Sequence, residues 1–199
     1  MPSQQPIGVI LAGGHGVRMG GAKLTVALRG QPLIRYPLEV MRSVLGEVAV
    51  ISKADILLPR MGATTVWIEP DMLNHPLFGV VEALGLAAGR PVLVCPADFP
   101  FVTPDLLAAL AAQSPEGRPA VVAAAGGVPC PLLGCYQPAA APLLSQAAHR
   151  GVSPEQTLAV LKPVLVEVGD ETELFDIDTP DDLLQAAAML DRIRPVVKG

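Results

Sequence analysis

Short, wholly apolar runs alternate along this chain with longer segments in which apolar residues recur at helical spacing. Apolar runs without polar alternation are typical of strands buried on both faces of a parallel sheet. The alternation therefore predicts an α/β fold, a mostly parallel sheet with helices on both faces. The predicted strands are Gly8–Ala12, Val48–Ser52, Thr64–Ile68, Val92–Cys95, Ala120–Ala124, Leu132–Tyr136, Val164–Val168 and Leu174–Ile177.

Three helix starts share one pattern: a hydroxyl residue, then proline, then a carboxylate, at Thr103-Pro104-Asp105, Ser153-Pro154-Glu155 and Thr179-Pro180-Asp181. The hydroxyl suits the N-cap, proline the first helical position and the carboxylate the positive end of the helix dipole. Pro37 is expected to limit how early the first helix begins. The predicted helices include Leu38–Leu45, Gly79–Ala88 and Pro104–Ala112, and Ala123–Pro131 is predicted to be a loop.

Composition excludes several classes of protein. The net charge of −5 argues against a nucleic-acid partner, and no uncharged apolar run approaches the ~18 residues of a membrane span. Met1–Pro6 lacks a positively charged segment, so we expect no signal peptide. Cys95, Cys130 and Cys135 show no CxxC spacing and the histidines are scattered, which disfavours zinc and predicts reduced thiols in a cytoplasmic protein.

The stretch Val9–Lys23 joins an apolar run to a loop that holds Gly13-Gly14, Arg18, Gly20-Gly21 and Lys23. Glycines let several backbone N–H groups converge on one point, and the two cations add positive charge. The combination predicts a cradle for a polyphosphate. The structural alternative is a plain strand-to-helix turn with two solvated cations. The loop is not a P-loop, because Leu24 follows the lysine.

Leu11-Ala12-Gly13-Gly14, Arg18-Met19-Gly20 and Lys23 together resemble the signature LAGG-x-x-x-RMG-x-x-K of the MobA-like family, the molybdenum cofactor guanylyltransferases. Gly30-Gln31-Pro32-Leu33 resembles the G-x-P-L that follows it. The resemblance implies a three-layer Rossmann-like nucleotidyltransferase fold in a single domain spanning residues 1–199. Residues up to about 115 would bind the nucleotide, and residues from about 116 would bind the acceptor.

Asp98 lies three residues beyond the apolar run Val92–Cys95. Ligands of open α/β sheets bind outside the carboxyl ends of the strands, so this carboxylate should face the same crevice as the glycine loop. Mg²⁺ prefers such hard oxygen ligands, and Asp98 matches the family's metal-binding aspartate. The structural alternative is an aspartate that caps the turn before Thr103.

Asp176 lies in the predicted strand Leu174–Ile177, and Asp178 directly follows it. Residues two apart along a strand point to the same face, so both carboxylates would lie on one face. Asp178 is a candidate second metal ligand, whereas Thr179, Asp181 and Asp182 are assigned to helix capping. The family often has asparagines here. The two aspartates resemble the cytidylyl-transferring relatives, which leaves the choice of nucleobase open.

Three further residues are carried over from the resemblance as nucleotide-binding candidates, beside Leu11, Ala12, Gly13, Gly14 and Lys23. Ser52 occupies the place of a family asparagine, and Asp71 resembles an aspartate that contacts the nucleotide. Gly79, in a segment resembling G-P-L-A-G, would allow close approach of the base. Gly13 replaces an alanine that is more frequent in cytidylyl relatives, and its small size would leave room for a purine.

The resemblance implies Mg²⁺-dependent transfer of GMP from GTP to molybdopterin–molybdenum cofactor, with release of pyrophosphate and with Arg18, Lys23 and Asp98 as catalytic residues. Molybdoenzyme-delivery proteins are candidate partners; neither nucleic acid nor membrane is expected. The alternatives are a CTP-dependent molybdenum cofactor cytidylyltransferase and a sugar-phosphate nucleotidyltransferase. A catalytically silent nucleotide-binding regulator is disfavoured because all three catalytic candidates are present.

Overall fold

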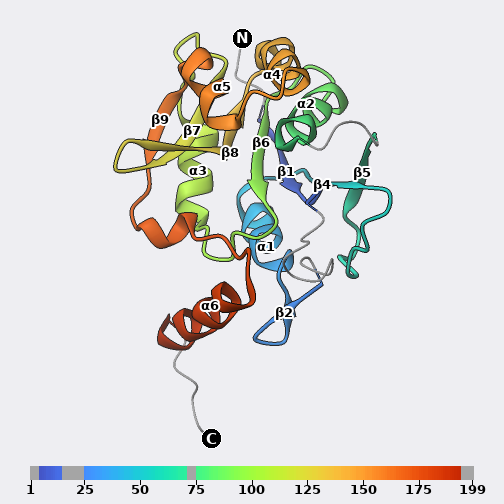
Figure 1. Cartoon of the computed structure of the whole chain (residues 1–199), viewed down its shortest axis with the longest axis vertical. Helices are drawn as coiled ribbons and strands as arrows, with labels where there is room; N and C mark the ends of the chain where they lie inside the picture. The colour runs from blue at the N-terminus through green and yellow to red at the C-terminus, as the bar shows by residue number, and fades with distance from the viewer. Residues whose placement is uncertain (1–4, 15–24, 71–74, 194–199) are drawn as a thin grey trace, which may run out of the picture.

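A computed structural model describes residues 5–14, 25–70 and 75–193 of the chain, and its centre is a seven-stranded sheet. The strand order is β5-β4-β1-β6-β8-β7-β9. All neighbouring pairs are parallel except those of β8, which runs antiparallel to β6 and to β7 (Figure 1). The strands are β1 (Ile7–Leu11), β4 (Val48–Lys53), β5 (Thr65–Glu69), β6 (Val92–Pro96), β7 (Ala120–Ala125), β8 (Val128–Tyr136) and β9 (Val164–Glu167).

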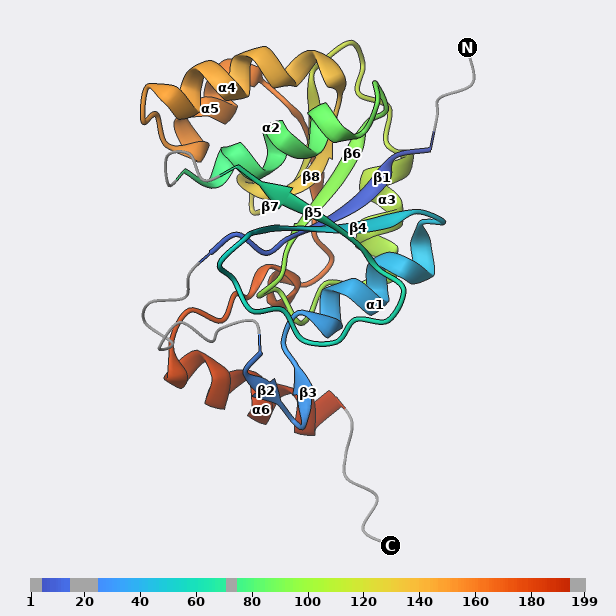
Figure 2. The same cartoon turned by 90° about the vertical axis from the view of Figure 1, so that its right-hand side faces the viewer.

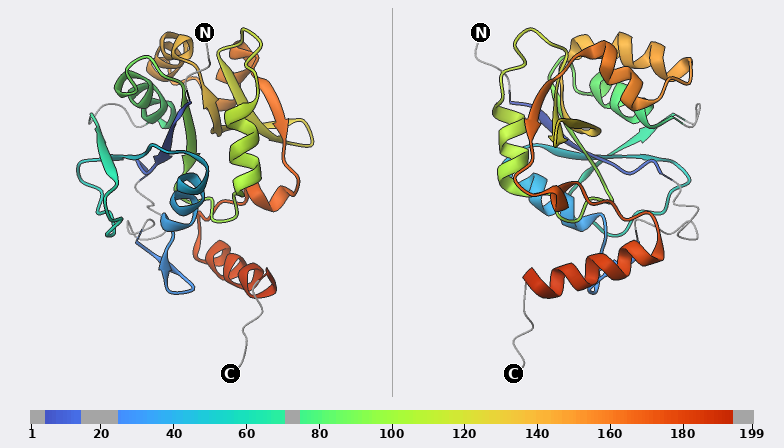
Figure 3. Two further views of the ribbon diagram at one scale, coloured as in Figure 1. Left: turned by 180° about the vertical axis from the view of Figure 1, so that it is seen from behind. Right: turned by 60° about the vertical axis from the view of Figure 1, so that its left-hand side comes forward.

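Helices cover both faces of this sheet, as the alternating pattern predicts. One face carries α2, α4 and α5, and the other carries α1 and α3 (Figure 2). Seen from behind, α1 and α3 lie side by side in front of the strands (Figure 3). The helices are α1 (Arg35–Val44), α2 (Pro76–Leu86), α3 (Pro104–Ala112), α4 (Ala141–His149), α5 (Pro154–Leu161) and α6 (Pro180–Ile193).

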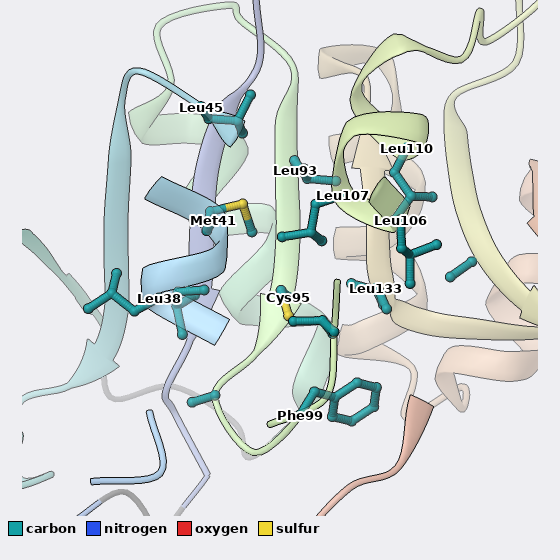
Figure 4. Close-up of a cluster of buried hydrophobic side chains, with 14 of the residues drawn as sticks. Leu38, Met41, Leu45, Leu93, Cys95, Phe99, Leu106, Leu107, Leu110 and Leu133 are labelled. Carbon is teal, nitrogen blue, oxygen red and sulfur yellow. The ribbon is translucent and has the colours of Figure 1, made fainter. Parts of the chain in front are cut away.

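The core is divided by the sheet into two apolar clusters. On one face, Met41 of α1 and Leu107 of α3 pack over Leu93 of β6, and all three are fully buried (Figure 4). On the other face, Val80 of α2 and Leu144 of α4 are equally buried. Burial on both faces explains why the central strands read as continuous apolar runs.

A third, smaller cluster joins the C-terminal helix to a hairpin of β2 (Ala27–Leu28) and β3 (Gln31–Pro32). Leu28 and Leu33 pack there against Ala186 of α6, and the Arg29 guanidinium pairs with Asp191. None of the helices in the described part of the chain has the length and apolarity that a membrane crossing requires.

The predicted loop Ala123–Pro131 is wrong, because most of it forms the β7–β8 hairpin. Ala125 pairs with Val128, so Gly126 and Gly127 alone form the turn. Their φ values of 56° and 79° lie in the left-handed region, which the two-residue turns of hairpins require and glycine adopts without strain. The Gly126-Gly127 pair therefore marks the turn of a hairpin between two strands, and not a long loop.

Two other expectations are corrected. Leu174–Ile177 is not a strand: a 3₁₀ helix, η3 (Glu171–Leu174), capped by Asp170, leads into an irregular segment. The helix α1 begins at Arg35, two residues before Pro37, because a proline in the first turn removes only an N–H that has no partner within the helix. The helix α4, which follows the 3₁₀ helix η2 (Pro138–Ala140), was not predicted.

Candidate nucleotide and metal site

The carboxyl ends of β5, β4, β1 and β6 lie next to one another at one edge of the sheet, since these four strands are parallel and adjacent. Backbone hydrogen bonds continue past the strand ends: Ala12 N–H donates to Ile51 O (2.8 Å), and Ala97 N–H donates to Leu11 O (3.0 Å). The segments after β1 and β6 are thereby held together. This edge also contains the point where the chain reverses its direction of strand addition, between β1 and β6, where open α/β sheets bind ligands.

Ser52 stabilises the start of the glycine loop from below. Its side chain is fully buried, and its Oγ lies 3.2 Å from Ala12 O and 3.3 Å from Lys53 O. The hydroxyl proton of Ser52 is therefore donated to a backbone carbonyl, and toward any further partner Ser52 can act only as an acceptor. The structure places Ser52 directly beneath the candidate loop, with its donor directed at the loop's own carbonyl.

The helix α2 brings Gly79 to the same edge, and His75 fixes where that helix begins. Nδ1 of His75 accepts a hydrogen bond from Leu77 N–H (3.2 Å), which makes His75 the N-cap. Its Nε2 lies 2.9 Å from Val152 O, and a carbonyl can only accept, so Nε2 carries the proton. The sequence assigned no role to His75; its role is to hold the start of α2.

Glu69, the last residue of β5, lies between the two candidate glycines. A Cβ built on Gly13 would lie 2.8 Å from Oε2 of Glu69, and one built on Gly79 would lie 3.7 Å from the same atom. Leu11 Cδ2 is 3.5 Å from that Gly79 position. The structure thus brings Leu11, Gly13 and Gly79 together around a carboxylate that the sequence analysis did not assign.

Glu69 and its neighbour Lys53 are both charged and both buried, with 7% and 6% of their surface exposed. They are register partners at the ends of β5 and β4. Burial raises the pKa of the Glu69 carboxyl; the Lys53 ammonium opposes this shift and the Glu82 carboxylate adds to it. The strand predicted from the sequence ends at Ile68, so Glu69 was left as an unassigned carboxylate just beyond it.

Asp98 follows β6 at the same edge, and its Oδ1 atom is buried. The backbone N–H of Ile177 donates to the carbonyl oxygen of Asp98 (3.2 Å), so the segment that contains Asp176 and Asp178 lies against the end of β6. The structure therefore brings the two segments together as expected. The expected geometry, two aspartates on one face of a strand, is wrong because no strand forms there.

The capping assignment after Asp178 is confirmed for two of its three residues. Thr179 N–H donates to Oδ2 of Asp182 (2.7 Å), and Asp182 N–H donates to Oγ1 of Thr179 (3.2 Å). This reciprocal pair is a capping box at the start of α6. Asp178 N–H also donates to Oδ2 of Asp182 (3.1 Å), which fixes the backbone at the candidate metal ligand.

The thiols near Asp98 are protonated side chains rather than nucleophiles. Burial raises the pKa of Cys130 to about 11, two backbone N–H groups lower it, and the charges of Asp176 and Asp98 raise it further. Burial, followed by the Asp98 charge, also raises the pKa of Cys95 well above its ordinary value. All three cysteines are free. These electrostatic effects place Asp176 near Cys130 and Asp98, on the β6 side of the edge.

The donor set suits Mg²⁺ but does not enclose it. Within residues 5–14, 25–70 and 75–193 there is no group of three or more His, Cys, Asp or Glu side chains arranged for a metal. Magnesium is usually held by one or two carboxylates plus substrate phosphates, so a protein cage is not required. Asp98 and Asp178 supply hard oxygen atoms of the right kind for such a site.

Four candidates remain to be placed. Arg18, Lys23 and Asp71 lie outside the described residues. Gly14 ends the first described segment, where it is exposed and where a Cβ would meet no atom of the described residues within 4 Å. For these residues the assignment still rests on the sequence.

Comparison with solved structures identifies the fold. A molybdopterin-guanine dinucleotide biosynthesis protein A from Archaeoglobus fulgidus matches with a TM-score of 0.74 at 23% identity, covering 93% of this chain and 98% of that one. A 2-C-methyl-D-erythritol 4-phosphate cytidylyltransferase from Thermus thermophilus matches with a TM-score of 0.65 at 22% identity, over 92% and 98%. At these identities the likeness shows the fold, which is that of Rossmann-like nucleotidyltransferases.

The family follows from the sequence comparisons. The model of the MobA-like NTP transferase domain matches residues 8–163, and the chain belongs to this family. A molybdenum cofactor guanylyltransferase from Pseudomonas syringae pv. syringae is 35% identical, over 86% of this chain and 88% of its own. A probable molybdenum cofactor guanylyltransferase from Pelotomaculum thermopropionicum is 29% identical, over 96% of each chain. The chain is thus a nucleotidyltransferase of the MobA-like type, as the glycine-loop signature predicts.

Proposed function

We propose that this chain transfers GMP from GTP to molybdopterin–molybdenum cofactor with release of pyrophosphate, and that the reaction depends on Mg²⁺. The observation that carries the proposal is the meeting of Leu11, Gly13, Ser52 and Gly79 at the sheet edge that also contains Asp98. Relatives named molybdenum cofactor guanylyltransferase, similar to this chain over most of its length, support the acceptor and the base.

In the proposed reaction a phosphate oxygen of the acceptor attacks the α-phosphorus of GTP. A new P–O bond forms as the bond between the α-phosphorus and the bridging oxygen breaks, and pyrophosphate carries away the electron pair. In such a reaction the protein contributes mainly by positioning the substrates and by neutralising the charge on the phosphates. Arg18 and the backbone N–H groups of the glycine loop bind the β- and γ-phosphates, and Lys23 stabilises charge that develops on the α-phosphate.

Asp98, with Asp178 as a second ligand, would hold the magnesium ion. When bound, that ion neutralises phosphate charge and orients the two substrates. The backbone bond from Ile177 N–H to Asp98 O and the bond from Asp178 N–H to Asp182 Oδ2 would fix the backbone at both aspartates before substrate arrives. Such preorganisation reduces the cost of reorganisation when the phosphates enter.

We also propose that the two halves of the chain bind different substrates. Residues up to about 115 contribute the nucleotide half of one domain, and residues from about 116 contribute the acceptor half. The three free thiols support a cytoplasmic location, where the acceptor and any molybdoenzyme-delivery partner would be met.

The second candidate is transfer of CMP from CTP, favoured by the aspartates at positions 176 and 178. Asp176 and Asp98 both interact electrostatically with Cys130, which supports a role for this segment beside the proposed metal rather than in reading the base. The deciding measurement is product formation from GTP and CTP at equal concentration with the pterin acceptor and Mg²⁺. Product from CTP exceeding that from GTP by about tenfold would overturn the guanylyl assignment.

A further inference from the structure

The carboxylate of Glu69 lies close to the backbone of two glycines, Gly13 and Gly79. Its Oε2 occupies the space that a side chain at Gly13 would fill, and it lies 3.7 Å from the Cβ position of Gly79. Leu11 and Ile51 bring apolar atoms to the Gly79 position, within 3.9 Å. Over nine-tenths of Glu69 is buried. A carboxylate is thus held against backbone and hydrocarbon at the sheet edge that binds ligands.

This carboxylate has capacity to accept hydrogen bonds that the described residues do not use. Within the described part of the chain, no N–H or O–H group donates to Glu69. A carboxylate that is largely shielded from water and accepts no hydrogen bond loses solvation, and here the charge of Lys53 offsets only part of that loss. Such a cost is common where a side chain is kept for a ligand. The missing donors are what a ligand would supply.

We propose that Glu69 selects the nucleobase by accepting two hydrogen bonds from guanine. The inference rests on the proposed function and adds the residue that decides which nucleotide binds. Guanine presents N1–H and the 2-amino group side by side, and these two donors match the two oxygens of an ionised carboxylate. Cytosine and adenine instead place a ring-nitrogen acceptor beside their amino group, so one carboxylate oxygen would face a lone pair.

The same geometry changes the explanation for Gly13. From the sequence, its small size was expected to leave room for the purine; in the structure that room is filled by Oε2 of Glu69. Among the described residues, a Cβ at position 13 would meet Oε2 at 2.8 Å and Cδ of Glu69 at 4.0 Å, and no other atom within 4 Å. An alanine at this position therefore acts on the base indirectly, by displacing the carboxylate.

Glu69→Gln tests the proposal by changing the pattern of donors without changing shape. An amide presents one donor and one acceptor, which match N3 and the 4-amino group of cytosine and mismatch guanine. With the full chain and Mg²⁺, calorimetric titration should show that the ratio of GTP to CTP affinity falls by about tenfold or more, the discrimination typical of one bidentate pair. Glu82→Gln removes a neighbouring carboxylate to which the proposal assigns no contact with the base, and it should leave the ratio unchanged.

A second set of variants tests the link between Gly13 and Glu69. Gly13→Ala should lower GTP affinity in the wild-type chain, because the new methyl group displaces Oε2. In the Glu69→Ala background the same substitution should have no further effect, since the only side chain it meets is gone. Circular dichroism of each variant checks that it is folded. Equal effects of Gly13→Ala in both backgrounds would contradict the link.

The outcomes separate this inference from the proposed function. If the wild-type chain prefers GTP and Glu69→Gln keeps that preference, Glu69 does not read the base, and guanylyl transfer stands. If the wild-type chain binds neither nucleotide, the proposed function is wrong irrespective of Glu69. If the wild-type chain prefers CTP, the guanine assignment and the role of Glu69 are both overturned.

Discussion

The backbone N–H of Ile177 donates to the carbonyl oxygen of Asp98 across 3.2 Å, and this bond joins the end of β6 to the segment that precedes α6. Ile177 is fully buried among Leu28, Leu33 and Ala186, so the bond is anchored by apolar packing on one side. The C-terminal helix therefore does more than cover the β2–β3 hairpin. It holds Asp178 at the edge where Asp98 lies.

Asp98→Asn should abolish Mg²⁺-dependent nucleotidyl transfer while the chain stays folded. Asparagine has the size of aspartate and can accept a turn hydrogen bond, but it lacks the anionic oxygen that magnesium requires. Steady-state assays over a range of Mg²⁺ concentrations, with thermal unfolding of the same sample, measure both properties. Asp105→Asn, in the first turn of α3, is the control and should leave activity unchanged. Near-normal activity of Asp98→Asn would leave only the capping role.

Lys23→Ala should lower turnover much more than affinity for GTP. An ammonium at the end of the glycine loop is proposed to meet charge that develops on the α-phosphate in the transition state. Loss of one such contact typically costs on the order of 3 kcal/mol, about a hundredfold in rate. The comparison of kcat and KM against the wild-type chain decides the matter: a raised KM with unchanged kcat would mean that Lys23 only binds the ground state.

The sequence predicted the layers of this fold because the central strands are buried on both faces. Val9 and Val94 are fully buried, and residues on both faces of their strands are covered by helices. These strands therefore appear in the sequence as continuous apolar runs. The hairpin at Gly126-Gly127 was missed because the same glycines fit a loop and a two-residue turn, and only the pairing of Ala125 with Val128 distinguishes them. Composition contains no direct information about that pairing.

The candidate site was predictable only where a motif marks it. Gly13 and Gly79 could be named from their resemblance to a known pattern, and the structure brings them to one edge. Glu69 could not be named, since its importance comes from the space that these two glycines leave, and that relationship between residues far apart in sequence exists only in the folded chain. Asp178 was expected at the end of a strand, but an irregular segment that follows the 3₁₀ helix η3 stands in place of that strand.

Gly134→Ala should destabilise the protein by about 1–3 kcal/mol, the usual cost of inserting a methyl group into a packed site. Gly134 lies in β8 between β6 and β7, and a Cβ there would lie 2.5 Å from Val121 O and 3.0 Å from the Cα of Val122. Backbone atoms of a paired strand cannot move aside as a side-chain end can. Chemical unfolding measures the change in free energy of unfolding.

Gly46→Ala is the matched control for that substitution. A Cβ at Gly46 would meet nothing within 4 Å, so its effect should stay within about 0.5 kcal/mol of the wild-type free energy of unfolding. If both alanine variants unfold at the same denaturant concentration as the wild-type chain, the close approach of β7 to Gly134 is not maintained in solution.

Glu69→Gln should make the protein more stable at neutral pH, and the gain should shrink as the pH falls. The pKa of Glu69 is raised in the folded state, chiefly by burial, above the value of about 4.3 for an exposed glutamate. Between the unfolded and folded pKa values the native state binds more protons than the unfolded state, so stability falls as pH rises through that window. Above it the carboxylate loses more solvation than the attraction of Lys53 offsets, and the amide avoids this net cost.

Thermal unfolding of the wild-type chain and Glu69→Gln from acid to neutral pH measures this difference. The two melting temperatures should converge at the acid end, where Glu69 is protonated in both states, and separate towards neutral pH with the variant higher. Glu47→Gln is the control, since Glu47 is an exposed partner of Arg90 and its pair contributes little. A wild-type chain more stable than Glu69→Gln at neutral pH would mean that the carboxylate stabilises the fold and is not kept at a cost for a ligand.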